Sequence, residues 1–224
     1  MGKKRSYDEG CAAAHGLDLI GERWALLVVR ELLLGPKRFT DLRASLPHVS
    51  PNVLSQRLRD LESSGIVRHH KLPPPAASQV YELTPWGMEL EPVIMALGRW
   101  AARSPSMPFT SPTSVNSLII AFRTMFDPEA AAGFSADLEL RLGEEMFQAR
   151  IVDGALELER GHVDQPDAVL EGDTETLKAL AFGEWPLDEA VQTGALTVTG
   201  DQVLAARFFK VFKLPEPVAP ATSA

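Results

Sequence analysis

The sequence predicts an α+β protein with two domains: an N-terminal winged helix-turn-helix domain and a C-terminal antiparallel sheet covered by helices. Apolar residues recur at helical spacing through most of the first hundred residues, whereas short alternating segments follow them. The balance of basic and acidic residues also changes near residue 103. Residues 1–103 carry 14 basic and 11 acidic side chains, and residues 104–224 carry 8 and 19. The net charge of −8 therefore does not exclude binding of a polyanion by the first domain.

Composition narrows the classes of protein to which the chain can belong. Hydrophobic residues make up 45% of the sequence, as in ordinary globular proteins, and no run approaches the roughly 18 apolar residues of a membrane-spanning helix. The N-terminus is basic without an apolar stretch behind it, so we expect no secretory signal and a cytoplasmic location. A single cysteine, Cys11, excludes an intramolecular disulfide, and no set of zinc ligands is evident. We expect no cofactor and no metal.

The first elements are predicted to be helices. An apolar stripe at helical spacing ends at Gly35-Pro36, where a turn is expected. Two shorter helices are expected at 39–46 and 50–63, with a turn at 47–49 between them. The apolar stripe consists of Leu17, Ile20, Trp24, Leu27, Val28 and Leu32.

A hairpin and a long helix are predicted next. Two extended segments, 66–72 and 78–84, are joined by PPPAA, which predicts a β-hairpin with a proline-stiffened tip. Thr84 followed by Pro85 predicts a helix start, and the apolar spacing behind it predicts a long amphipathic helix up to 102. Helix, turn, helix and wing in this order form a winged helix-turn-helix, whose second helix lies in the major groove of DNA.

The helix predicted at 50–63 has the features of a DNA-reading helix. Ser50 is a good N-cap and Pro51 suits the first helical position. One side of the helix is apolar and is expected to be buried, and the other side is polar and is expected to face outward. The apolar side consists of Val53, Leu54, Leu58 and Leu61, and the outward side of Asn52, Ser55, Gln56, Arg57 and Arg59.

These outward residue types are the ones that DNA recognition uses. Asn and Gln pair with adenine edges, Arg pairs with guanine or phosphate, and Ser contacts either. We expect base contacts from Asn52, Ser55 and Gln56, and mixed base and phosphate contacts from the two arginines. The alternative is that the polar side is only a solvated helix surface. The predicted DNA-binding residues are Arg38, Thr40, Ser50, Asn52, Ser55, Gln56, Arg57, Arg59, His69, His70 and Lys71.

The first domain resembles a known family of regulators. The segments CAAAHGLDLIGERWALLVVRELLLGPKRFTDLRASLPHVSPNVLSQRLRDLESSGIVRH and YELTPWGMEL are similar to the HxlR family of bacterial winged-helix regulators, from Cys11 to about Arg103. The resemblance implies a homodimer that binds short inverted repeats, with residues 11–20 and 85–102 forming the interface. The apolar surface of these segments exceeds what so small a domain can bury alone. The dimerisation residues expected from it are Leu17, Trp86, Leu90, Val93, Ile94, Leu97 and Trp100.

The resemblance also draws attention to Cys11. A cysteine at this position is common in the family, and some members sense oxidants or electrophiles through it. At the start of a helix, with Lys3, Lys4 and Arg5 in the preceding segment, the thiolate of Cys11 would be stabilised. The alternative is a small, partly buried residue at a dimer interface.

The second domain is predicted to follow a linker at 104–114, which is rich in Pro and Ser. Turns such as Gly143-Glu144 separate consecutive strands and favour an antiparallel meander, and the helices that follow the strands are expected to cover one face of the sheet. The domain is expected to end at 214, before a flexible tail at 215–224. The predicted strands are 117–126, 136–142, 145–152, 155–160 and 168–172, and the predicted helices are 174–183, 186–194 and 201–214.

The stretch EGDTETLKALAFGEWPLDEAVQTGALTVTGDQVLAARFFKVF is similar to the sterol carrier protein type of domain. Such domains enclose an apolar tunnel for a lipid-like ligand, so the resemblance implies an apolar small-molecule effector. The alternative is that the aromatic and aliphatic residues in question are simply core. The residues expected near a tunnel are Phe182, Trp185, Leu187, Leu196, Phe208, Phe209, Val211 and Phe212.

The sequence supports three functional hypotheses and no enzymatic one. The five histidines are scattered, and no nucleophile elbow, zinc-protease, Walker or dinucleotide motif is present. The first hypothesis is a homodimeric DNA-binding transcriptional regulator whose C-terminal domain senses an apolar molecule. The second is a lipid carrier or sequestration protein with secondary DNA binding, and the third is a redox sensor acting through Cys11. The acidic C-terminal surface argues against a membrane as partner.

Overall fold

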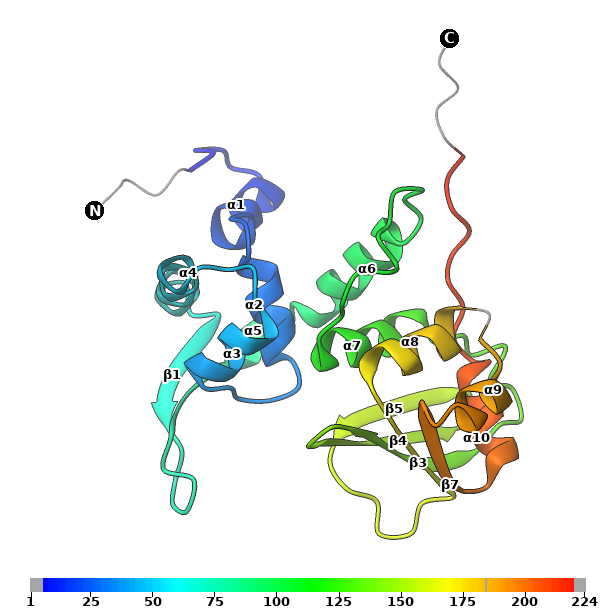
Figure 1. Ribbon diagram of the computed structural model, residues 1–224. Helices are drawn as coiled ribbons and strands as arrows, with labels where there is room; N and C mark the ends of the chain where they lie inside the picture. The colour runs from blue at the N-terminus through cyan, green and yellow to red at the C-terminus, as the bar shows by residue number, and fades with distance from the viewer. Residues whose placement is uncertain (1–5, 184, 220–224) are drawn as a thin grey trace. The chain divides into compact units, whose positions relative to one another are not determined.

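The computed structural model describes residues 6–183 and 185–219, and these form two compact units that divide between Ile94 and Met95 (Figure 1). The fold class is α+β, as predicted. No helix in the described part of the chain is long and apolar enough to cross a membrane.

The first unit is a helix-turn-helix with a two-stranded wing. Strands β1 and β2 pair antiparallel, from Val67 opposite Leu83 to Lys71 opposite Gln79. Side chains of α2, α3 and α4 meet in a core in which Val28, Leu42 and Leu54 have no exposed surface. Its elements are α1 (Ala12–Ile20), α2 (Ala25–Leu32), α3 (Phe39–Ser45), α4 (Pro51–Ser63), β1 (Val67–Lys71), β2 (Gln79–Leu83) and α5 (Pro85–Met88). Helix α6 (Glu91–Ala101) crosses the division into the second unit.

The long helix predicted from 85 to 102 is two helices, α5 and α6. Its start is as predicted, since Thr84 caps α5 by accepting a hydrogen bond from the Gly87 amide at 3.0 Å. The break has a simple cause in Pro92. Proline has no N–H to donate to the carbonyl of Met88 and its ring clashes with that carbonyl, so a new helix begins with Pro92 in its first turn.

Position 87 requires glycine because α5 packs closely against the chain at Ile66, just after α4. A Cβ atom added there would lie 2.2 Å from the carbonyl oxygen of Ile66, which is backbone and cannot move aside easily. Thr84 fastens the same place, because its hydroxyl donates to the carbonyl of Gly65 at 2.7 Å. The start of α5 is therefore held tightly against the chain that leaves α4.

The second unit contains a five-stranded sheet in the order β5-β4-β3-β6-β7. The predicted meander is present, because β3, β4 and β5 pair antiparallel through the turns at Gly143 and Gly154. The prediction of a wholly antiparallel sheet is wrong, since β6 runs parallel to β3. The elements are α7 (Val115–Met125), β3 (Ala136–Leu142), β4 (Glu145–Val152), β5 (Ala155–Arg160), β6 (Ala168–Gly172), α8 (Thr174–Phe182), α9 (Leu187–Gln192), β7 (Leu196–Gly200) and α10 (Gln202–Phe209).

The segment 117–126, predicted as a strand, is the helix α7. Ser114 caps it by accepting a hydrogen bond from the Ser117 amide at 3.2 Å. The buried residues Leu118, Phe122 and Met125 are spaced by four and three residues, which is helical spacing. The continuous apolar run from Leu118 to Phe122 resembles a buried strand, and periodicity does not distinguish a strand from a helix over so short a stretch. Figure 1 shows α7 and α8 lying over one face of the sheet.

The segments predicted as linker and tail are hydrogen-bonded within the second unit. In the predicted linker, Thr113 accepts a hydrogen bond from Lys178 Nζ at 3.2 Å, and its amide donates to Glu175 at 3.0 Å. In the predicted tail, the Val218 amide donates to the carbonyl of Arg103 at 2.8 Å. Residues 220–224, the end of that tail, lie outside the described residues.

The outer face of this sheet contains a buried carboxylate, that of Glu139 on β3. The loop between β5 and β6 covers it, and the carboxylate accepts hydrogen bonds from the Val163 amide at 2.9 Å and from Arg141 Nε at 2.7 Å. His162 Nδ1 lies 2.5 Å from the same group. Burial acts to raise the pKa of Glu139, but these hydrogen bonds and the nearby positive charges outweigh it and lower the pKa.

Candidate nucleic-acid interface

Helix α4 presents three of the predicted base-reading residues to solvent. It begins at Pro51 behind the N-cap Ser50, whose hydroxyl oxygen accepts a long hydrogen bond of 3.4 Å from the Val53 amide. Leu54, Leu58 and Leu61 anchor the opposite side in the core. The exposed residues are Asn52, Gln56 and Arg59, and Ser55 is half-buried.

Two predictions about the faces of α4 are wrong. The Arg57 side chain is only 16% exposed, and its Nη1 atom pairs with Asp60 at 3.0 Å and with Glu22 at 3.6 Å. Arg57 lies three residues after Leu54 and four before Leu61, so it borders the buried stripe. Val53, predicted to be buried, is 38% exposed because no leucine of the stripe lies three or four residues from it.

The exposed polar residues of α4 are joined to one another. Arg59 Nη2 donates to Gln56 Oε1 at 2.7 Å, and Gln56 Nε2 donates to Asp60 Oδ1 at 2.8 Å. Asp60 also holds Arg57, whose Nε atom is buried with no hydrogen-bond partner among the described residues. Asp60 was not among the predicted site residues, although an acid four residues after Gln56 is the spacing that would have indicated the contact.

The preceding helix, α3, contributes a paired arginine. Arg38 donates two side-chain hydrogen bonds to Asp41, at 2.9 and 2.8 Å, and its amide donates to the same carboxylate at 3.1 Å. The hydrogen bond from Arg38 lowers the pKa of Asp41, and the same bond raises the pKa of Arg38. Both Arg38 and Thr40 are exposed at the start of α3. Contact between Arg38 and a phosphate would compete with this pair.

The wing carries its cations on β1. His69 stacks on Tyr81 of β2 with the ring centroids 4.4 Å apart, while its side chain remains exposed. His70 is half-buried, with Nε2 3.7 Å from Glu82, and Lys71 is exposed. Arg68, which the sequence prediction missed, is exposed and pairs with Glu82 at 2.6 Å.

The predicted dimerisation residues are largely exposed. In α6, all of whose residues the structure describes, none is buried, and Trp100 is 74% exposed. Val93, Leu97 and Trp100 are spaced by four and three residues, so they share one side of α6. Leu17 and Trp86 are also exposed, whereas Leu90 and Ile94 are half-buried.

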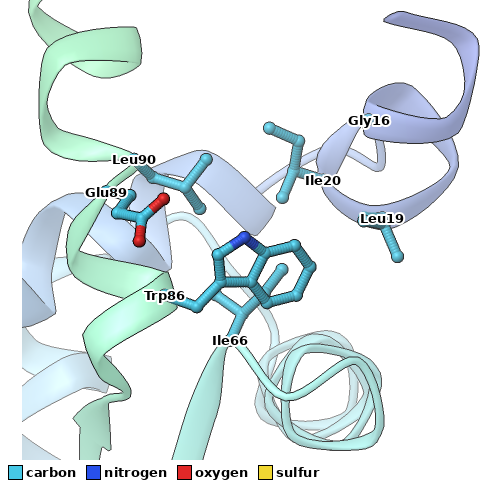
Figure 2. Close-up of a pocket in the computed structure, with 7 residues that line it drawn as sticks. All are labelled: Gly16, Leu19, Ile20, Ile66, Trp86, Glu89 and Leu90. Carbon is cyan, nitrogen blue, oxygen red and sulfur yellow. The ribbon is translucent and has the colours of Figure 1, made fainter. Parts of the chain in front are cut away.

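Between α1 and α5 the surface is hollowed. The hollow has a volume of about 190 Å³, and Figure 2 shows the indole of Trp86 within it, together with Ile20 and Leu19 of α1. Glu89 contributes its only charged side chain among the described lining residues. The remaining lining residues are Gly16, Ile66 and Leu90.

The predicted ligand-binding residues of the second unit lie in or beside its aromatic core. Phe208, Phe209 and Phe212 are buried, as are Leu196 and Val211, and Phe182, Trp185 and Leu187 are half-buried. Their partner is Phe122 of α7, which sequence reasoning missed because it assigned that segment to a strand. The ring of Phe122 stacks on Phe212 at 4.6 Å and meets Phe208 edge-on at 5.9 Å. These rings fill space between helices as a packed core does.

Cys11 stands at the start of α1 and is exposed. The amides of Ala14 and Ala13, at the N-terminus of the helix, lower the pKa of its thiol. The basic residues predicted to assist, Lys3, Lys4 and Arg5, lie outside the described residues. No group of three or more His, Cys, Asp and Glu that could hold a metal ion occurs in the described part of the chain.

Comparison with known proteins gives different relatives for the two parts of the chain. Residues 19–107 match the family described as HxlR-like helix-turn-helix, and residues 111–218 match the family described as alkyl sulfatase C-terminal. The second match does not confirm the sterol carrier type that the sequence suggested, which stays a prediction. A solved sec-alkylsulfatase, Pisa1 from Pseudomonas sp., is 17% identical, with a TM-score of 0.42, and covers 48% of this chain and 17% of that one.

The first part has curated relatives among bacterial regulators. The reduced form of the transcriptional regulator YodB from Bacillus subtilis, a solved structure, is 31% identical, covers 44% of this chain and 97% of that one, and has a TM-score of 0.39. The uncharacterized HTH-type transcriptional regulator YvaP from the same species is 38% identical over 85 residues, which are 38% of this chain and 79% of YvaP. With this relative and the match at residues 19–107, the chain belongs to the HxlR-like family of helix-turn-helix transcriptional regulators.

Proposed function

We propose that the protein is a cytoplasmic transcriptional regulator that reads an inverted-repeat operator as a homodimer, with α4 in the major groove of each half-site. The observation that carries the proposal is the exposed set Asn52, Gln56 and Arg59 on the second helix of a helix-turn-helix. The wing residues His69, His70 and Lys71 would reach the flanking backbone. We assign DNA binding and dimerisation to residues 1–103, which carry the basic excess.

The proposed dimer uses the exposed apolar residues of α1, α5 and α6. A two-fold axis brings the same surface of each protomer together. Both copies of each exposed tryptophan would therefore be covered in one interface. The absence of any buried residue in α6, which is described in full, supports this assignment. Two reading helices held in this way would be spaced for half-sites about one DNA turn apart.

Binding to DNA from upstream of the protein's own gene tests this proposal. Fluorescence anisotropy should show affinity that falls as salt rises, because phosphate contacts release counterions. Asn52→Ala should weaken the binding of DNA. Glu157→Ala is the control and should leave the affinity unchanged, since Glu157 is exposed on β5 of the acidic unit. Salt-independent binding, or equal affinity in the two variants, would contradict a role for α4.

We assign the effector role to residues 115–214, joined through 104–114, and retain an apolar small molecule as the effector. The support for an apolar ligand is the apolar set Phe182, Trp185 and Leu187, which lie half-buried beside the packed aromatic core. A ligand that binds one dimer arrangement better than another would change the separation of the reading helices. Mass spectrometry of co-purified molecules would identify the ligand. Equal operator affinity with and without it would refute the coupling.

Two alternatives make different predictions. A lipid carrier with secondary DNA binding would show tight, salt-insensitive lipid affinity and no salt-dependent binding to upstream DNA. A redox sensor is favoured by the exposure of Cys11 and the lowered pKa of its thiol, because the thiolate is the reactive form. Cys11→Ser should then abolish the response of DNA binding to oxidants, and an unchanged response would exclude Cys11 as the sensor.

A further inference from the structure

The side-chain amide of Gln56 is held from both ends on the outward side of α4. Its Nε2 atom donates to Asp60 Oδ1 at 2.8 Å, and its Oε1 atom accepts from Arg59 Nη2 at 2.7 Å. An ionised carboxylate only accepts hydrogen bonds and a guanidinium only donates them. The two neighbours therefore fix which end of the amide is oxygen and which is nitrogen, because the reverse orientation would set donor against donor and acceptor against acceptor.

The fixed amide determines what the helix offers to a base. One lone pair of the Gln56 oxygen accepts from Arg59, and one of the two Gln56 N–H groups donates to Asp60. What remains for DNA is one lone pair of that oxygen, the second Gln56 N–H and the other N–H groups of Arg59, so donors outnumber acceptors. Guanine presents two acceptors, N7 and O6, in the major groove, whereas adenine presents one acceptor and one donor. A glutamine that pairs with adenine accepts through its oxygen, and at Gln56 the Arg59 guanidinium lies against that oxygen and competes for it.

We propose that Asp60 is a positioning residue that sets base preference, so that Gln56 and Arg59 read guanine in preference to adenine. This inference rests on the proposed function of α4 as the reading helix. Asp60 itself does not contact the base. It acts by holding the amide of Gln56 in the donating orientation.

Asp60 is suited to this role because it is anchored on its other side. Its second oxygen, Oδ2, pairs with Arg57 Nη1 at 3.0 Å, and Arg57 is itself held 3.6 Å from Glu22. The Asp60 side chain is only 26% exposed. Rotating it away from Gln56 would break the pair with Arg57, so the orientation of the amide is coupled to a partly buried ion pair.

Selection of binding sites from random duplex DNA by the full-length protein tests the inference. The position read by Gln56 is the one whose base preference disappears in Gln56→Ala. At that position the wild type should prefer guanine to adenine by roughly 5- to 150-fold, the discrimination of one good bidentate pair. In Asp60→Asn the amide is no longer held by a charged acceptor, and the guanine to adenine ratio should fall at least about fivefold.

Glu22→Gln is the matched control. Like Asp60→Asn it removes one negative charge paired with Arg57, so both variants should tighten binding to all duplexes alike. Only Asp60→Asn touches Gln56, so Glu22→Gln should keep the guanine to adenine ratio of the wild type. Circular dichroism of both variants checks that α4 is intact, and Gln56→Ala supplies the test independently if Asp60→Asn does not fold.

Three results would overturn the inference: a preference for adenine at the Gln56 position, no change of preference anywhere in Gln56→Ala, or equal ratios in Asp60→Asn and the wild type. Failure of the proposed function itself looks different. In that case no duplex would be enriched from the random pool, and no salt-dependent binding would be measured for the wild type or for any variant.

Discussion

Trp100 provides a quantitative test of the proposed dimer. Its side chain is 74% exposed on α6, so an interface that covered it would remove about 150 Å² of a side chain of roughly 200 Å² from water. At about 25 cal/mol per Å² this is at most about 4 kcal/mol per protomer. Allowing for partial burial and the remaining Ala, we expect Trp100→Ala to cost about 1.5 kcal/mol per protomer and so to weaken the dimer by about 3 kcal/mol, or roughly a hundredfold in dissociation constant.

Sedimentation equilibrium of the full chain over a range of concentrations measures this change. Val203→Ala is the control, because Val203 is 76% exposed on α10, outside the proposed interface, and should leave the dissociation constant unchanged. A change of less than about threefold in Trp100→Ala would show that the tryptophan is not covered in the dimer. Equal weakening by both variants would show that the effect is not specific to α6.

The remaining predictions concern stability, each measured by urea unfolding followed by circular dichroism. Gly87→Ala should destabilise the first unit by at least about 2 kcal/mol, because the new Cβ meets the Ile66 carbonyl, whereas Gly16→Ala in open space on α1 should be neutral or stabilising. Phe122→Ala should destabilise the second unit by about 3–5 kcal/mol, as a fully buried ring is lost. The lowered pKa of Glu139 means that its stabilising contribution is present above about pH 4.3 and is lost as pH falls through the folded-state pKa, so Glu139→Gln should show a shallower loss of stability in acid.

Local signals predicted the order of helices and wing in the first unit, although not the break between α5 and α6. Ser50 and Thr84 mark the starts of α4 and α5 as expected, because capping depends on residues close together in the chain. The polar side of α4 was also predictable from spacing, except near its edge. Arg57 failed there because it lies three residues after Leu54 and four before Leu61, at the border of the buried stripe, where spacing alone does not separate buried from outward residues.

The second unit was harder to predict because its organisation depends on distant contacts. The apolar run at 117–126 fits a buried strand as well as a helix, and only its packing through Phe122 against α10 decides between them. The parallel pairing of β3 with β6 joins Leu138 to Ala168, so turn signals between neighbouring strands could not reveal it. Glu139 alternates with apolar residues on β3, a pattern typical of a solvated face, yet it is buried because the loop from β5 to β6 passes over it.

The parallel pairing of β3 with β6 has a consequence for the order of folding. Strands β3, β4 and β5 are joined by tight turns and can associate through local contacts. Strand β6 must instead close a loop of about thirty residues to reach β3, and that closure costs conformational entropy before any pairing compensates for it. The Asp167 carboxylate accepts from the Asp137 amide at 2.8 Å at this junction, so it lies where the late strand docks. Refolding should therefore proceed from a three-stranded nucleus, with β6 and β7 joining last and setting the rate.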